Sequence, residues 1–415
     1  LETLYPFQRA GVMFMKIAKR AICADEMGTG KTRQAIATMM SHYIDGVDPF
    51  PILIVCPNST KLGWKREFEE VWPGLEVTVV KGNITQRRKQ LSTPAHVFIM
   101  NWESIRSHSR LAAYGNTAFV LCEECGGEDP KISAAACHAH EGELNRINFK
   151  AVVADECHKM KDGASQQTRA LKAATGDADI RIGMSGTPIA NNPIDLWSIL
   201  NWISPEEWPS KTRCVDRMVE ISMDMWGKKT PTGVKLAMKD EFFAALDPRL
   251  RRMPKELVLP YLPDVVYERK DIEMSPKQKK AYEQMRDQMI AELDDGEVVT
   301  TTSALTKSLR LLQFASSFAE TEVTEEWDEE KQEVVPHTKV YLKAPSNKVD
   351  AFIDDIEDFG KSQVVVFATS KQLINLLADK LEKKGYILGR QYGLITGDIG
   401  IDDRQQYMDR FQSGK

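Results

Sequence analysis

Short apolar runs alternate with longer amphipathic stretches along the first half of the chain. Stretches such as 32–43 and 61–72 carry apolar residues at every third or fourth position, and this spacing predicts helices. Buried β-branched runs that alternate with helices are typical of a parallel sheet in an α/β fold. The expected strands are 52–56, 77–80, 96–100, 151–155 and 181–185. We therefore expect an α/β fold built on a parallel sheet for residues 1–203.

The strand rhythm stops after about residue 204 and returns near the end of the chain. Helical patterns dominate the intervening region, and the expected helices are 240–252, 275–294 and 303–319. The acidic run 320–333 predicts a solvated loop or hairpin. A second set of α/β signals follows, with an apolar run at 363–368, a helix at 371–384 and a strand at 394–396. The predicted organisation is a first lobe over 1–203, a helical region over 204–345 and the start of a second lobe over 346–415.

Composition changes this picture little but removes several classes of protein. The chain has 415 residues, 42% of them hydrophobic and 28% charged, and 55 basic against 60 acidic residues give a net charge of −5. These values are ordinary for a soluble globular protein and exclude a disordered tail, a collagen and a small disulfide-rich scaffold. No apolar run approaches the roughly 18 residues of a membrane span, and the first residues carry no signal-peptide pattern. The seven cysteines are odd in number and unevenly spaced, which favours a reducing compartment.

Residues 24–32, Ala-Asp-Glu-Met-Gly-Thr-Gly-Lys-Thr, are typical of a phosphate-binding loop that opens a helix. In such a loop, backbone N–H groups converge on phosphate oxygens, and the N-terminus of the following helix adds positive potential. Lys31 would reach the β- and γ-phosphates of a nucleotide, and the Thr32 hydroxyl would bind Mg²⁺. Asp25 occupies the position of the first glycine in the full G-x-x-x-x-G-K-[ST] pattern, so a chance turn stays an alternative. The predicted nucleotide-binding residues of this loop are Gly28, Thr29, Gly30, Lys31 and Thr32.

Two further strand ends carry candidate chemistry. The run 151–155 ends in Asp155 and is followed by Glu156, which places two carboxylates at a sheet edge where ligands bind. Asp155 would hold Mg²⁺ directly or through water, and Glu156 would orient or deprotonate an attacking water; an exposed acidic turn is the alternative. The second strand end, 184–188, reads Met-Ser-Gly-Thr-Pro, and Thr187 and its neighbours could sense a γ-phosphate. An ordinary strand-to-loop turn is the alternative there.

The order of these motifs resembles that of the Swi/Snf-type ATPases of helicase superfamily two, DEAD/DEAH-box-like proteins that translocate on double-stranded DNA. Residues 187–196 and the opening motif also resemble the annealing-helicase (SMARCAL-like) branch or phage relatives. The matching segments are 4–12 (Q motif), 24–32 (motif I), Pro57-Asn58-Ser59-Thr60-Lys61 with Trp64 and Glu67 (motif Ia), Asn101-Trp102-Glu103 (motif Ib), 155–158 (DEAH box, with cysteine for alanine), 184–192 (motif III), Leu250-Arg251-Arg252 with Leu262-Pro263 (the RR-x-K and LP signatures), 364–368 (motif IV), and Gly397, Arg404 and Phe411 (a later G…R…F pattern).

The resemblance implies a motor made of two RecA-like lobes that face each other across ATP. Lobe 1 would be 1–203, a helical protrusion would follow over 204–345, and a partial second lobe would occupy 346–415. Lys31, Asp155 and Glu156 would be catalytic, Gln8 would read adenine, and His158 and Thr187 would complete the nucleotide site.

The implied partner is double-stranded DNA, bound by a monomer with little sequence specificity. Because the net charge is near neutral, the basic surface for DNA must be local. The residues expected to contact DNA are Thr60, Lys61, Trp102, Arg251 and Arg252.

One departure from the family pattern concerns the arginine fingers. Motifs V and VI lie after the G…R…F pattern in this family, and the chain stops at Lys415 before both. Loss of an arginine finger typically costs about 10³-fold or more in rate. We therefore expect the 415-residue chain to bind ATP and to hydrolyse it poorly.

A second departure is an insertion at about 120–142, where the family has a short connection. It contains Cys122-x-x-Cys125 and Cys137-x-x-His140 in a C-x₂-C-x₁₁-C-x₂-H pattern. Two such knuckles match tetrahedral Zn²⁺, and four protein ligands make a structural rather than a catalytic site. His138 is a rival fourth ligand, and a disulfide or free thiols are the alternatives. We predict a small zinc knuckle inserted in lobe 1.

Three other functions stay open at this point. The chain could be a strand-separating helicase, an RNA-stimulated ATPase, or a non-hydrolysing, ATP-responsive DNA-binding subunit. The compact layout predicts a cytoplasmic protein of a bacterial or phage-infected cell, or a nuclear one if the source is eukaryotic.

Overall fold

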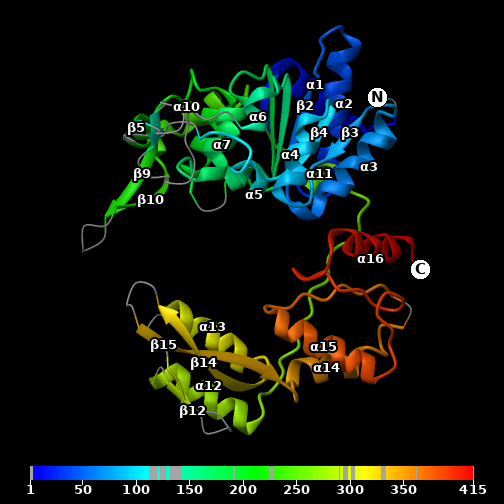
Figure 1. The fold of residues 1–415 in the computed structure, drawn as a ribbon, viewed down its shortest axis with the longest axis vertical. Helices are drawn as coiled ribbons and strands as arrows, with labels where there is room; N and C mark the ends of the chain where they lie inside the picture. Colours follow the sequence, from blue (N-terminus) through cyan, green and yellow to red (C-terminus); the bar gives the residue numbers. More distant parts are fainter. Residues whose placement is uncertain are drawn as a thin grey trace. The chain divides into compact units, whose positions relative to one another are not determined.

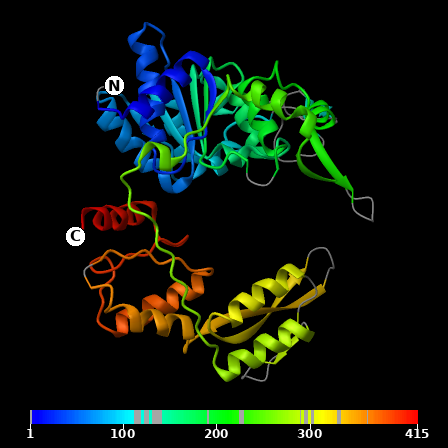
Figure 2. The ribbon, with the colours of Figure 1, turned by 180° about the vertical axis from the view of Figure 1, so that it is seen from behind.

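A computed structural model of the chain forms two compact units, Leu1–Asp264 and Val265–Lys415, whose ribbons are shown in Figure 1 and, from behind, in Figure 2. The boundary between the units lies inside the predicted helical region 204–345. The division into functional domains at 203 and 345 stays a prediction. The structure describes residues 3–111, 119–121, 128–130, 142–189, 192–223, 229–288, 290–292, 298–300, 304–328, 333–360 and 362–414.

The first unit is built around a seven-stranded sheet in which every pair of neighbouring strands is parallel. The predicted α/β fold with a parallel sheet is thereby confirmed. Its strand order is β11 (Leu250–Arg251), β1 (Arg20–Cys23), β8 (Ile180–Met184), β7 (Ala151–Asp155), β2 (Ile52–Cys56), β4 (Val97–Asn101) and β3 (Val77–Val79).

Apolar side chains on both faces of this sheet are buried, because successive residues of a strand point to opposite faces. In β2, Ile52 and Ile54 belong to one buried cluster, and Leu53 and Val55 belong to the other. Side chains of α1, α2 and α3 complete the first cluster, and those of α5, α6, α7 and α8 complete the second. These helices are α1 (Pro6–Ala18), α2 (Lys31–Ile44), α3 (Lys61–Val71), α5 (Trp102–Ile105), α6 (Glu143–Arg146), α7 (Gln166–Thr175) and α8 (Asp195–Ile203).

The remaining elements of the first unit lie outside this sheet. One hairpin, β9–β10, is antiparallel and most of its described side chains are exposed or half-buried. Strands β5 and β6 pair with each other in a second two-stranded sheet. These elements are α4 (Ile84–Ser92), α9 (Lys211–Met218), α10 (Lys239–Leu246), α11 (Lys255–Val258), β5 (Phe119–Leu121), β6 (Glu128–Pro130), β9 (Val219–Met223), β10 (Lys229–Val234), and the 3-10 turns η1 (Asn58–Thr60), η2 (Cys157–Met160) and η3 (Leu236–Met238).

The prediction of a helix over 240–252 is wrong for the C-terminal part of this range. Helix α10 stops at Leu246, and Leu250 and Arg251 form the edge strand β11. The backbone N–H groups of Ile22 and Ala24 donate hydrogen bonds of 2.6 Å to the carbonyls of Arg249 and Arg251. Pairing with β1 therefore decides the conformation of this segment, and it brings the segment beside the loop that follows β1.

The second unit has its own buried cluster, which includes Met285, Phe314, Leu342, Ile353 and Leu381. The helix expected at 371–384 forms as α15, but those expected at 275–294 and 303–319 form only in part. Helix α12 ends at Gln288 and is followed by strand β12, and α13 ends at Phe314 before β14 begins at Phe318. The described residues of the acidic run lie in the hairpin β14–β15. The elements of the second unit are α12 (Pro276–Gln288), β12 (Ile290–Glu292), β13 (Val298–Thr300), α13 (Ala304–Phe314), β14 (Phe318–Asp328), β15 (Glu333–Lys343), α14 (Asn347–Asp355), α15 (Lys371–Lys383) and α16 (Ile401–Ser413).

The strands expected at 363–368 and 394–396 are not assigned as strands in the described part of the second unit. Val365 and Phe367 are 59% and 91% exposed, so the first run lacks the cover that a buried strand needs. A partial second RecA-like lobe over 346–415 therefore stays a prediction.

Among the helices that the structure describes, none has the length and the apolar content that crossing a membrane requires.

Candidate nucleotide-binding site

The loop between β1 and α2 adopts a backbone conformation that requires glycine at two positions. Gly28 and Gly30 have φ angles of +82° and +74°, in the left-handed region where a side chain is strained. A Cβ atom on Gly30 would lie 2.4 Å from Nε2 of Gln8. Gly30 caps the 14-residue helix α2, which begins at Lys31. The predicted phosphate loop thus stands at the N-terminus of a full helix, as anion binding requires.

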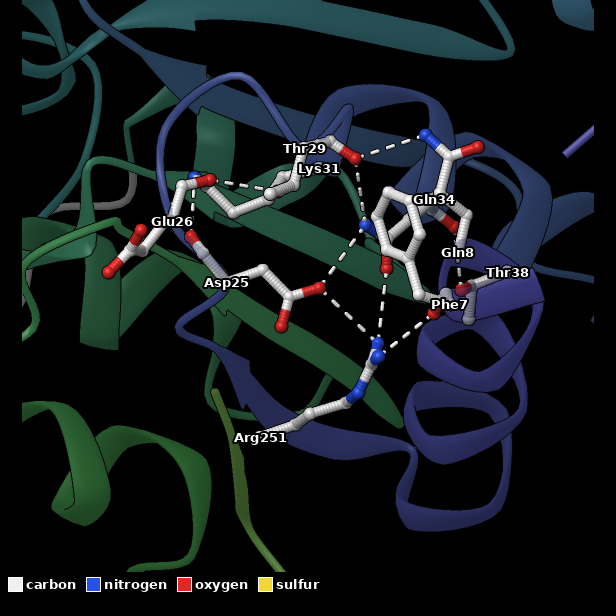
Figure 3. A network of polar contacts seen from close by, with 9 residues as sticks. All are labelled: Phe7, Gln8, Asp25, Glu26, Thr29, Lys31, Gln34, Thr38 and Arg251. Carbon is white, nitrogen blue, oxygen red and sulfur yellow. Dashed lines mark hydrogen bonds and ion pairs between the residues drawn. The ribbon is translucent and has the colours of Figure 1, made fainter. Parts of the chain in front are cut away.

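The Lys31 side chain lies along this loop (Figure 3). Its ammonium group donates hydrogen bonds to the carbonyls of Asp25 at 2.8 Å and Glu26 at 3.0 Å. The Thr29 hydroxyl donates to the same Glu26 carbonyl at 2.8 Å. The cation therefore lies at the loop itself, where a phosphate group would meet it.

Gln8 joins the start of α1 to the loop. Its side-chain nitrogen donates to the Thr29 carbonyl at 3.0 Å, and its side-chain oxygen accepts from the Tyr5 backbone N–H at 3.0 Å. Gln8 is 7% exposed. The structure thus places the predicted adenine reader against the predicted phosphate loop.

Asp155 stands at the end of β7, two strands away from the loop strand β1. Its carboxylate accepts hydrogen bonds of 3.0 Å from the Trp64 indole and the Glu156 backbone N–H. The Trp102 indole donates to the Asp155 carbonyl at 2.8 Å. Burial raises the pKa of the Asp155 carboxyl, and the Trp64 indole and the Lys31 charge act in the opposite direction. The indoles of two tryptophans, from α3 and α5, thus fix this predicted magnesium ligand.

Glu156 is held by Ser185, which follows the neighbouring strand β8, and by His158 of the turn η2. Its Oε2 atom accepts from the Ser185 hydroxyl at 3.3 Å and lies 3.1 Å from His158 Nδ1. His158 Nδ1 and the Ser185 hydroxyl are 3.0 Å apart, and the Thr187 N–H donates to that hydroxyl at 3.2 Å. Glu156 has a φ of +52°, which a non-glycine residue seldom adopts. The structure therefore brings the two predicted strand-end motifs into one polar cluster.

This cluster lies beside the phosphate loop. The Ser185 N–H donates to the Cys23 carbonyl at 3.2 Å, at the end of the loop strand. A Cβ atom on Gly186 would lie 3.0 Å from Met27 Cγ and 3.8 Å from Lys31 Nζ. Three segments that are far apart in the sequence therefore meet at the carboxyl ends of β1, β8 and β7.

A family model described as "SNF2-related domain" matches residues 7–319, which is more than half of the chain. This chain belongs to the SNF2-related domain family. The expected resemblance to Swi/Snf-type ATPases is thereby confirmed.

Curated relatives of this SNF2-related chain include an uncharacterized ATP-dependent helicase of Mycoplasma pneumoniae, 23% identical over 422 residues that cover 100% of this chain and 34% of the relative. Chromodomain-helicase-DNA-binding protein 7 of Gallus gallus is 24% identical, and the match covers 95% of this chain and 12% of that relative. Human chromodomain-helicase-DNA-binding protein 8 is 25% identical, with 95% and 14% covered. The chain thus spans about a third or less of these relatives.

A solved structure also resembles the SNF2-related chain. It is the Sulfolobus solfataricus SWI2/SNF2 ATPase core in complex with dsDNA, which is 18% identical at a TM-score of 0.48. The likeness covers 99% of this chain and 75% of that one.

The residues of this SNF2-related chain that were expected to contact DNA have unlike surroundings. Thr60 and Arg252 are exposed. The Lys61 ammonium is buried, donates to the Val80 carbonyl at 3.1 Å and to Asn101 Oδ1 at 3.3 Å, and has a pKa that burial lowers. Trp102 is fully buried, and Arg251 is part of the polar network of Figure 3. DNA contact by these residues stays a prediction, and the described contacts of Lys61, Trp102 and Arg251 are internal.

The predicted zinc ligands Cys122, Cys125, Cys137 and His140, and the rival His138, lie outside the described residues. In the part of the chain that the structure does describe, no group of three or more His, Cys, Asp or Glu side chains could hold a metal ion. The zinc knuckle stays a prediction.

Sequence reasoning missed two features of the site. The first is the contact of the Ser185 hydroxyl with both Glu156 and His158, and the second is the pair of indole hydrogen bonds on Asp155. Trp64 and Trp102 are visible as motif residues, but a sequence pattern does not say where an indole N–H points.

Proposed function

We propose that this chain is part of an ATP-dependent DNA motor that hydrolyses ATP to translocate on or remodel double-stranded DNA. The observation that carries the proposal is the meeting of the loop 24–32, the Asp155–Glu156 pair and the 185–187 segment at one edge of the parallel sheet. Family membership and relatives named as ATP-dependent or DNA-binding helicases support it.

The residues of the site fit ATP and Mg²⁺. A loop with two left-handed glycines at the start of a long helix suits phosphate oxygens, and Lys31 supplies a cation there. The Thr32 hydroxyl and the Asp155 carboxylate are hard oxygen donors of the kind that Mg²⁺ prefers. When bound, Mg²⁺ would neutralise charge on the β- and γ-phosphates.

Each residue of the site then has its own role in binding or hydrolysing ATP. Lys31 binds phosphate, and Gln8 lies where it can hold the base against the loop. Glu156 orients the attacking water and accepts its proton, because His158 and Ser185 fix one oxygen of its carboxylate. Thr187 lies two residues after Ser185 and donates its N–H to the Ser185 hydroxyl, so a change at the γ-phosphate would reach the Glu156 cluster through this segment.

The test is the ATPase rate of the full-length gene product with duplex DNA, single-stranded DNA, RNA or no nucleic acid. We expect strongest stimulation by duplex DNA and a loss of about 10²–10⁴-fold in Glu156→Gln, since a general base supplies that much. Stronger stimulation by single strands or by RNA would replace the duplex motor with a strand-separating or RNA-dependent enzyme. ATP binding without stimulated turnover would replace it with a non-hydrolysing, ATP-responsive subunit.

The proposal includes a structural zinc ion held by Cys122, Cys125, Cys137 and His140, supported by the spacing of these residues. Elemental analysis of the purified protein should find about one zinc per chain, lost in the Cys122→Ser/Cys125→Ser double variant. Zinc content unchanged by that variant would refute the site. For location, we propose the bacterial or phage-infected cytoplasm, or the nucleus of a eukaryotic cell.

A further inference from the structure

Asp25 is a buried carboxylate within the phosphate loop. It is 0% exposed, and it stands where the full loop pattern has a glycine. Its Oδ2 atom lies 3.3 Å from Arg251 Nη1 and accepts a 3.3 Å hydrogen bond from Gln34 Nε2. Its Oδ1 atom has no hydrogen-bond partner among the residues that the structure describes. A carboxylate so placed is costly without a cation beside it, and Arg251 supplies that cation.

Arg251 reaches the loop from β11, 226 residues further along the chain. Its Nη2 atom donates to the Phe7 carbonyl at 2.8 Å, and its Nη1 atom donates to Gln34 Oε1 at 3.4 Å. Its side chain is only 12% exposed. One guanidinium group therefore ties together the start of α1, the loop and helix α2 (Figure 3).

The same network fixes the backbone that is expected to hold phosphate. Gln34 Nε2 also lies 3.4 Å from the Thr29 carbonyl, which accepts a second hydrogen bond from Gln8. Thr29 stands between the two left-handed glycines of the loop. A displaced Gln34 or Asp25 would therefore shift the peptide groups on which phosphate binding depends.

Gly11 of α1 shows how closely this network is packed. A Cβ atom at this position would lie 1.9 Å from Gln34 Oε1 and 2.1 Å from Arg251 Nη1. Both atoms end flexible side chains, but both are committed to hydrogen bonds inside the network. Alanine at position 11 would therefore displace Gln34 and Arg251, although its own Cβ atom would not contact the loop.

We infer that Arg251 is a positioning residue for the nucleotide loop and acts through Asp25 and Gln34. This inference rests on the proposed ATP site. A loop that is held in its binding conformation loses little freedom when the nucleotide arrives, whereas a loosened loop must be ordered at the expense of affinity. Arg251 thus serves ATP binding from a segment that the sequence assigns to DNA contact.

The test is a titration of the 415-residue chain with a fluorescent ATP analogue and Mg²⁺, without DNA, well below the melting temperature. Arg251→Gln and Gly11→Ala should each weaken binding about tenfold or more, as expected for losing buried charge-assisted hydrogen bonds, and Arg251→Lys should be intermediate. Arg251→Gln combined with Asp25→Asn should bind no more weakly than the worse single variant, because the two side chains act as one unit.

Two matched controls accompany these variants. Arg249 lies near Arg251 in sequence, but its side chain forms an ion pair of 2.6 Å with Glu207 rather than with a residue of the loop. The ATP affinity of Arg249→Gln should therefore stay within about twofold of the wild type. Gly63 lies inside α3, and a Cβ atom there would meet nothing within 4 Å. Gly63→Ala should likewise bind as the wild type does.

The outcomes separate the inference from the function on which it rests. If Arg251→Gln and Gly11→Ala lower the melting temperature but leave the ATP affinity unchanged, Arg251 is only structural and the inference is wrong. If Arg251→Gln keeps its ATP affinity but weakens binding in a separate titration with duplex DNA, the guanidinium is a DNA contact instead. If Lys31→Ala also binds ATP normally, the proposed ATP site itself has failed.

Discussion

Trp64 acts on the predicted magnesium ligand through a single N–H group. Its ring is 1% exposed, and its indole donates to Asp155 Oδ2 at 3.0 Å. Removing a residue that hydrogen-bonds to a metal ligand typically lowers the metal affinity or the activity by about 10–100-fold. Trp64→Phe keeps an aromatic ring in the core but loses the donor, so of the hydrogen bonds described for the carboxylate only the one from the Glu156 N–H is left.

We therefore expect Trp64→Phe in the full-length protein to need about tenfold more Mg²⁺ for half-maximal ATPase activity. The affinity for the nucleotide without metal should stay close to that of the wild type. The measurement is ATPase rate against Mg²⁺ concentration, with Trp72→Phe as the control, since Trp72 lies in an aromatic cluster with Tyr43 and Phe50. Equal Mg²⁺ requirements in the two variants would contradict this role of Trp64.

Helices α7 and α8 hold a lysine in a largely neutral environment between them. Lys172 donates to Asn201 Oδ1 at 2.6 Å and lies 5.4 Å from the centre of the Trp197 ring. Burial lowers the pKa of Lys172 to about 8 from an ordinary value of 10.5. Between these two pH values the unfolded chain binds more protons at this site than the folded one, so Lys172 makes stability rise with pH.

Lys172→Met removes this titration. The free energy of unfolding of the wild type, relative to that of Lys172→Met, should rise from about pH 8 to pH 10.5 with a slope of at most about 1.4 kcal/mol per pH unit. Urea unfolding at several pH values measures it. Lys65→Met is the control, because the Lys65 side chain is 42% exposed, and it should follow the wild type at every pH. A constant difference between the wild type and Lys172→Met would show that the two helices do not perturb the ammonium group.

The elements that could be predicted from the sequence are those whose pattern is local. Strand β2 and residues 151–154 of β7 are apolar because both faces of these strands are buried, and this is visible as a continuous run. Strand β11 has two residues and exists only because it pairs with β1, so no local pattern marks it. The run 363–368 has the pattern of a strand, but a strand also needs neighbours, which pattern alone does not supply.

In the first unit as a whole, some features of the site could be predicted from the sequence and others could not. The loop 24–32 and the Asp155–Glu156 pair could be predicted, since their chemistry depends on residue type and spacing. The internal positions of Lys61 and Trp102 could not, because residue type favours the surface for lysine and leaves tryptophan undecided. The link between Arg251 and Asp25 joins distant parts of the chain, and only the folded sheet brings them together.

The central claim is that the loop 24–32 binds ATP, and the most direct measurement is a titration of wild type and Lys31→Ala with a fluorescent ATP analogue and Mg²⁺. We predict saturable binding by the wild type, competed by ATP, and a loss of about tenfold or more in Lys31→Ala, because this cation meets the phosphates. Melting curves without nucleotide should show both proteins folded at the temperature of the titration, although Lys31→Ala loses two hydrogen bonds to loop carbonyls. Equal affinity in the two proteins, or binding by neither, would contradict the account.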